Sequence, residues 1–145
     1  MSITASGLFG LTLEKCLNNG AAINLEAETY KVAMITDSET PNFDTDATWA
    51  DLSANEVSGA GYTAGGVAYT STEITLSGGT LKYDAADVSW ASSTITSAMA
   101  GVGYASGVAD ELIFLSDFVT AASTTAGTFT IQWNASGIFT LDYTP

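Results

Sequence analysis

The 145-residue chain contains no histidine and no arginine, and it has only three lysines and one cysteine. Without histidine it lacks the side chain that most often serves as general base, proton shuttle or metal ligand near neutral pH. Without arginine it lacks the planar fork that binds carboxylates and phosphates through two hydrogen bonds. Cys16 has neither a second cysteine for an internal disulfide nor a histidine to activate it as a nucleophile. We therefore expect no enzyme activity, no bound cofactor or metal, and a Cys16 side chain that is buried or partly buried as a small hydrophobic group.

Positive charge is scarce, since 16 acidic residues give a net charge of −13. Proteins that bind nucleic acids place several lysines or arginines on phosphates, and anionic membrane surfaces also attract basic segments. We therefore expect no nucleic acid and no membrane as partner. The apolar tract "GLFGLTL" is far shorter than the roughly 20 residues that span a bilayer. The preceding "MSITAS" lacks the basic region of a secretory signal, so we expect synthesis in the cytoplasm without secretion by that route.

Strand signals dominate the rest of the chain. Runs rich in β-branched and aromatic residues, separated by turn residues, predict about eight strands: 29–36, 66–77, 81–84, 87–92, 94–106, 111–118, 127–134 and 137–143. Residues 77–80 predict a tight turn, and the last two strands predict a closing hairpin. Because no long helices alternate with the strands, the sequence predicts an all-β single domain, an antiparallel β-sandwich or jelly-roll-like fold.

Two segments depart from the strand pattern. Apolar residues at helical spacing in 6–19, "SGLFGLTLEKCLNN", predict a short helix that begins near Ser6 and ends at Asn19-Gly20. We divide the chain accordingly into an N-terminal arm or helix, 1–20, and a β-sandwich domain, 21–145. Residues 37–56 predict a long polar loop, and its apolar side chains indicate that the loop packs against the body of the protein.

The stretch "NEVSGAGYTAGG", residues 55–66, is unusually rich in glycine. A phosphate-binding loop would end in Lys-Ser or Lys-Thr, and that lysine is absent. A dinucleotide-binding loop would open a helix, whereas strand-like residues follow here. We interpret the glycines as residues that allow positive φ angles and close backbone approach in tight turns.

Clusters of acidic and aromatic residues leave other possibilities open. Asp37, Glu39, Asp44, Asp46 and neighbouring acids could supply oxygen ligands for Ca²⁺, but they lack EF-hand spacing, and a solvated acidic surface explains them better. The three tryptophans could form a platform for sugars. Aromatic residues that alternate with polar ones in strands more often fill a core.

Three stretches together carry a distinctive set of motifs: "YKVAMITDSETPNFDTDATWADLSANEVSGAGYTAGGVAYT", "DAADVSWASSTITSAMAGVGY" and "GTFTIQWNASGIFTL". The order is a Y-K-V-A strand, an acidic loop, the glycine-rich stretch, a D-V-S-W strand and a terminal hairpin. This set resembles the small structural proteins of tailed bacteriophages that decorate, or cement, the capsid. The resemblance covers about residues 29–141, and none of its motifs is catalytic.

The resemblance implies a β-sandwich-like virion protein that binds the outer surface of the phage head and braces the capsid lattice. Its partners would be the major capsid protein and further copies of itself, with a homotrimer favoured over a dimer. A tail or fibre component, or a carbohydrate-binding module displayed on the particle, is the alternative. We expect the N-terminal segment to contact the capsid or a neighbouring protomer through Leu8, Phe9, Leu11 and Leu13. We expect Phe43 and Trp49 to hold the long loop against the body of the protein or against a neighbour. These six residues are the candidate interface residues. The competing interpretation is that the N-terminal residues complete the protein's own core.

Overall fold

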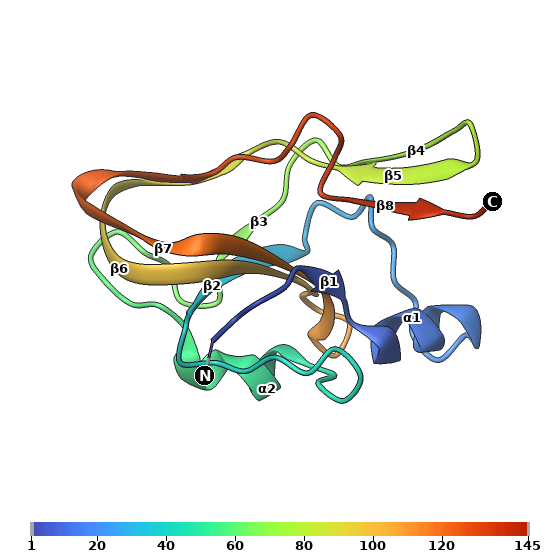
Figure 1. The fold of residues 1–145 in the computed structure, drawn as a ribbon, viewed down its shortest axis with the longest axis horizontal. Coiled ribbons are helices and arrows are strands. Elements are labelled where there is room, and N and C mark those ends of the chain that lie inside the picture. The colour runs from blue at the N-terminus through green and yellow to red at the C-terminus, as the bar shows by residue number, and fades with distance from the viewer. Residues whose placement is uncertain (1, 145) are drawn as a thin grey trace.

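A long antiparallel hairpin organises the computed structural model, which describes residues 2–144. Its strands are β6 (Val88–Ala105) and β7 (Glu111–Ile131). The sequence predicted two strands in place of each, and that prediction is wrong because β-bulges absorb the irregular residues without ending the strand. Left-handed backbone at Ser92, Ser97 and Val119 lies among these irregularities. Figure 1 shows the result, since β6 and β7 run through the middle of the molecule, bend together and return above it.

Two antiparallel sheets form on this framework. The large sheet has the strand order β1-β7-β6-β2-β3, and the small sheet has the order β4-β5-β8. The remaining strands are β1 (Gly7–Leu8), β2 (Lys31–Thr36), β3 (Val67–Ala68), β4 (Glu73–Ser77), β5 (Thr80–Asp84) and β8 (Phe139–Asp142). The protein is therefore an all-β, sandwich-like single domain, as the sequence predicted.

Strand partners differ from the predictions in two places. The predicted strand 66–77 is divided, so that β3 joins the large sheet and β4 joins the small one. The predicted closing hairpin is also wrong. Residues at the end of β7 pair with the start of β6, whereas β8 pairs with β5, for example Leu141 with Leu81. The turn at 77–80 is confirmed, since β4 and β5 are joined there.

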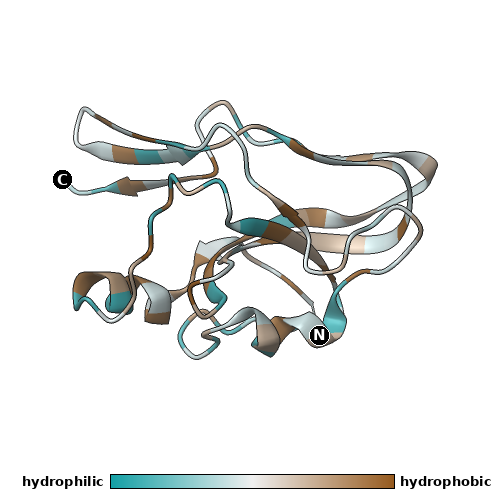
Figure 2. Ribbon diagram, turned by 180° about the vertical axis from the view of Figure 1, so that it is seen from behind, coloured by the Kyte–Doolittle hydropathy of each residue, from teal (hydrophilic) through white to brown (hydrophobic). Residues whose placement is uncertain are grey.

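The core lies on both faces of the large sheet. In β2, Val32 and Met34 belong to the cluster between the two sheets, whereas Ala33 and Ile35 belong to a second cluster on the opposite face. Successive side chains of a strand point to opposite faces, so a strand buried on both faces carries apolar residues at every position. Figure 2 shows this concentration of hydrophobic residues on the central strands.

The loop 37–56 covers the second face of the large sheet, as its apolar residues predicted. It contains the one-turn helix α2 (Trp49–Leu52) and the 3₁₀ turn η1 (Ser53–Asn55). Thr48 and Asp51 form a capping box at the start of α2. The Trp49 ring stacks on Tyr104, with ring centroids 5.2 Å apart and an interplanar angle of 7°. This contact holds the loop on the sheet.

The N-terminal helix is shorter than predicted. Helix α1 covers Gly10–Leu17, because the preceding residues form β1 and pair with β7. Ser6 does not cap the helix; its Oγ accepts a hydrogen bond from the Asp117 N–H at 2.9 Å. The predicted burial of Cys16 is wrong, since this residue is exposed. Its side chain lines an open groove between the helix and the small sheet.

The glycine-rich stretch 55–66 behaves as its composition indicated. Gly65 and Gly66 have φ angles of +77° and +75°. A Cβ added at Gly66 would overlap the Val32 carbonyl oxygen. A Cβ at Gly59 would overlap the Thr94 carbonyl oxygen in the same way. These glycines let the turn lie directly against β2 and β6, which is the close approach that only glycine permits.

Candidate functional site

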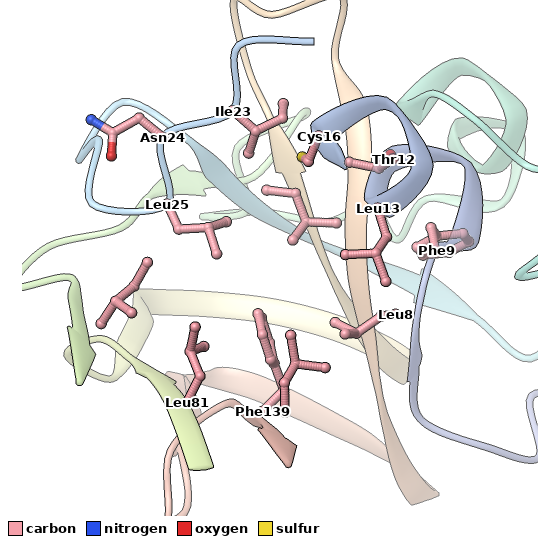
Figure 3. A pocket seen from close by; sticks show the side chains of 13 residues that line it. Leu8, Phe9, Thr12, Leu13, Cys16, Ile23, Asn24, Leu25, Leu81 and Phe139 are labelled. Atoms are coloured by element: carbon pink, nitrogen blue, oxygen red, sulfur yellow. The ribbon is translucent and has the colours of Figure 1, made fainter. Parts of the chain in front are cut away.

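An open apolar groove lies between α1 and the small sheet (Figure 3). Its volume is about 280 Å³, close to the lower end of the range for ligand-binding cavities. Ile113 of β7 and Leu8 of β1 line it together with α1, with the loop residues that include Ile23 and Leu25, and with side chains of the small sheet. The groove therefore combines the N-terminal segment, the loop before β2 and the last strand of the chain.

One stripe of α1 and its N-cap forms the helical wall of the groove. Phe9, Thr12, Leu13 and Cys16 have the spacing i, i+3, i+4, i+7, which places them on one face of a helix. Phe9 is buried beneath the helix, whereas Leu13 is 41% exposed. Leu17, one turn beyond Leu13, is 83% exposed. The helix thus presents leucine side chains to the groove and to the solvent beside it.

The register of the small sheet creates the opposite wall. Leu76 pairs with Leu81, and Leu81 pairs with Leu141, so the three leucines form one row across the sheet. In the neighbouring row, Tyr83 is buried in the core, and its partners Ile74 and Phe139 also line the groove. In the leucine row, Leu81 and Leu141 line the groove, whereas Leu76 lies outside it and is 66% exposed. Figure 2 shows hydrophobic residues on both the small sheet and α1.

Polar groups occur at the base of the helical wall. The Thr12 hydroxyl is buried and has no hydrogen-bond partner within residues 2–144. Lys15 forms an ion pair with one carboxylate oxygen of Glu111, a buried residue of β7. Although Cys16 is exposed, desolvation by the groove around it and then the Glu111 carboxylate raise the pKa of its thiol. The thiol is therefore protonated near neutral pH and a weak nucleophile.

The surroundings of the groove are acidic. Glu14 on α1 and Glu26 in the loop before β2 are exposed, whereas the exposed Glu73 and Asp142 lie on the face of the small sheet opposite the groove residues Ile74 and Leu141. The Glu26 carboxylate lies beside the groove residue Ile74, whose N–H donates to it at 3.3 Å. The nearby lysines do not offset this charge, because Lys15 and Lys82 pair with Glu111 and Asp84. The apolar groove is therefore set in a negative surface.

The predicted interface residues divide into two groups. Leu8, Phe9 and Leu13 line the groove. Phe43 packs on Phe9, with ring centroids 5.1 Å apart, and Trp49 is buried in the core. These two side chains hold the loop against the protein's own body.

Leu11, the remaining predicted interface residue, does not line the groove, and the sequence analysis missed the groove residues of the small sheet. Leu11 is half-buried and lies off the groove stripe. The leucine row of the small sheet was not among the predicted residues. Its alternation within each strand was visible, but only the pairing of β4, β5 and β8 places the three leucines together.

The acidic loop and the tryptophans serve structural roles. The Asp46 carboxylate accepts from the Asn42 N–H at 2.8 Å, and Asp51 accepts from the Thr48 N–H at 2.8 Å. Across residues 2–144, no group of three acidic or cysteine side chains is arranged to hold a metal ion. Trp49 and Trp90 are buried in different core clusters, so they form no common exposed platform. Among the described helices, none is long and apolar enough to cross a membrane.

No family model matches the chain, and comparisons with curated proteins and with solved structures find no match. We therefore base the functional proposal on the chemistry of the groove and on the sequence motifs.

Proposed function

We propose that this chain is a structural protein of a tailed-phage particle, which binds the outer surface of the capsid as a cement or decoration protein. The observation that carries the proposal is the open apolar groove, because the N-terminal residues Leu8, Phe9 and Leu13 line it. The apolar N-terminal segment that contains these residues, which lies outside the family resemblance, is the one that the sequence predicted to contact the capsid or a neighbouring protomer. An exposed apolar surface with a polar surround is characteristic of protein–protein contact sites.

The mechanism is stabilisation by binding. A protein that binds the mature lattice, but not the ruptured one, stabilises the mature lattice by mass action. Many copies on repeated positions add their effects, and oligomerisation increases the avidity of each attachment. The resemblance favours a homotrimer, with a dimer second. An acidic chain of net charge −13 suits docking positions that are basic.

Cryo-electron microscopy of the parent particle tests this function. We expect density for the sandwich at regular positions on the outer face of the head. Particles carrying Leu13→Glu should lose this density, because a charge would enter the apolar groove. Particles carrying Val119→Glu serve as the control, since Val119 is also exposed but does not line the groove. Density confined to the tail or fibres would contradict the cement function.

A further inference from the structure

We propose that the groove binds a polypeptide segment that combines aliphatic side chains with flanking lysine or arginine residues. Only the source of this segment rests on the proposed function, under which the capsid subunit supplies it. The binding chemistry itself follows from the groove. Three properties of the groove specify this occupant: apolar walls, an acidic surround and a buried hydroxyl.

The walls select aliphatic side chains. Leu13 on the helix and Leu8 beside it line the groove on one side, and Leu81 and Leu141 of the small sheet line it on the other, as Figure 3 shows for Leu8, Leu13 and Leu81. Branched aliphatic walls of this kind exclude charged groups, since those would lose their hydration without gaining a partner. Aliphatic side chains that enter the groove would remove its leucines from water.

The surround selects positive charge on either side of the aliphatic residues. Glu14 lies on the helix that forms one wall of the groove, and the Glu26 carboxylate accepts from the N–H of the groove residue Ile74. Lys15 and Lys82 already have acidic partners. A segment with lysines or arginines would therefore find complementary charge on α1 and on the loop before β2, which increases both the association rate and the specificity of binding.

A buried polar atom gives a further indication that the groove takes a peptide. The Thr12 side chain lines the groove, and its hydroxyl has no partner in the described part of the chain. Such groups are usually hydrogen-bonded in folded proteins. A peptide backbone carries a donor and an acceptor at almost every residue, so a docked segment can satisfy this hydroxyl once the Thr12 side chain rotates it out of its cover. A purely hydrocarbon ligand cannot.

A second copy of the chain is a poorer occupant. Each copy carries a net charge of −13, and a symmetric contact at the groove would bring the same acidic residues face to face. Like charges across an interface oppose association. The charge of the groove thus favours a basic partner over self-association at this surface.

Selection from a random peptide library on the immobilised full-length protein tests the occupant directly. We expect enriched peptides to carry aliphatic residues flanked by lysine or arginine, and to bind more weakly as salt is raised. Binding should weaken at least about tenfold in a Leu13→Glu, Leu141→Glu variant, as expected when buried leucine contacts are lost. The Val119→Glu variant should bind like the wild type, because this exposed apolar residue does not line the groove.

The single cysteine provides a test that needs no substitution. Cys16 lines the groove, so alkylation with pyrene maleimide should fill the groove and abolish binding of the selected peptide. Circular dichroism of the alkylated protein and of the variants checks that the fold is intact. Binding that survives both alkylation and the double substitution would overturn the proposal.

Other outcomes are equally decisive. Selection of no groove-dependent peptide, or of peptides without basic residues, would overturn the proposed chemistry. Self-association that analytical ultracentrifugation detects in the wild type, but not in the double variant, would show that a second copy occupies the groove. The capsid assignment fails separately: peptide binding at the groove without density on the head would contradict only the proposed function. Undiminished decoration of the head by the double variant would contradict only the claim that the groove binds the capsid subunit.

Discussion

The hydroxyl of Tyr62 donates a hydrogen bond to Oε1 of Glu56 at 2.8 Å, which closes the glycine-rich stretch onto itself. The same carboxylate oxygen accepts from the Gly65 N–H at 2.7 Å. The Tyr62 oxygen in turn accepts from the Met34 N–H of β2 at 3.0 Å. Tyr104 of β6 donates to the Gly65 carbonyl oxygen at 2.6 Å. Hydrogen bonds to β2 and β6 therefore hold this turn, and these polar groups stabilise the fold.

Removing the Tyr62 hydroxyl should destabilise the protein. Tyr62→Phe leaves the buried Met34 N–H without its acceptor, so we expect a loss of about 1–3 kcal/mol in the free energy of unfolding. Chemical denaturation measures this quantity. Tyr69→Phe is the matched control, because the Tyr69 hydroxyl is buried with no hydrogen-bond partner among residues 2–144. That variant should be as stable as the wild type or more stable, and equal losses in the two variants would contradict the network.

Alanine at Gly66 should be far more damaging than alanine at Gly78. Both glycines have positive φ, but a Cβ at Gly66 would overlap the Val32 carbonyl oxygen, whereas a Cβ at Gly78 would have no atom within 4 Å. We expect Gly78→Ala to cost about 1 kcal/mol from backbone strain. Gly66→Ala should cost more than about 2 kcal/mol, since steric overlap adds to the strain. Thermal unfolding of the two variants provides the comparison, and similar melting temperatures would show that the close approach to β2 is unimportant.

Alkaline pH should unfold the protein through its buried tyrosines. Burial is the largest cause that raises the pKa of Tyr62, Tyr69 and Tyr83, and it raises the pKa of Tyr104 to about 12. A raised folded-state pKa means that the unfolded chain loses these protons first. Their contribution to stability is full below the unfolded-state pKa of about 10 and is lost as pH rises beyond it.

The measurement for this prediction is the ultraviolet absorbance of tyrosinate, followed together with circular dichroism. We expect ionisation of the buried tyrosines to coincide with loss of the fold above about pH 10. Tyr69→Phe should shift the transition to higher pH, because one buried phenol is removed. Ionisation of all six tyrosines near the unperturbed pKa with the fold intact would contradict this expectation.

Asparagine in place of Val119 should stabilise the irregular stretch of β7 between Asp117 and Ala122. Val119 has a φ of +66° and is 80% exposed, so it is strained and contributes little to packing. Asparagine tolerates left-handed backbone far better than a β-branched residue. We expect a gain of about 1 kcal/mol in the free energy of unfolding. Leu76→Asn, a control at an exposed apolar residue of β4, should give no such gain; an equal gain there would point to a general effect of surface polarity.

The strand content and the inner packing could be predicted because they depend on local patterns. Apolar residues at every position of 32–35 are typical of a strand buried on both faces, and β2 is such a strand. Phe43 and Trp49 likewise predicted that their loop packs on the body. The continuity of β6 and β7 could not be predicted, because the bulges are stabilised by pairing between strands that are distant in sequence.

The candidate groove shows the same division. The sequence by itself determined the all-β class, the glycine turns and the leucines of the N-terminal segment, because side-chain periodicity and backbone freedom are properties of neighbouring residues. Only the tertiary structure decided that β8 pairs with β5 and not with the end of β7. That pairing places Leu81 and Leu141 side by side in the groove that Leu13 lines from the helix. Strand partnership is decided by burial summed over the whole chain, so no short stretch of the sequence contains it.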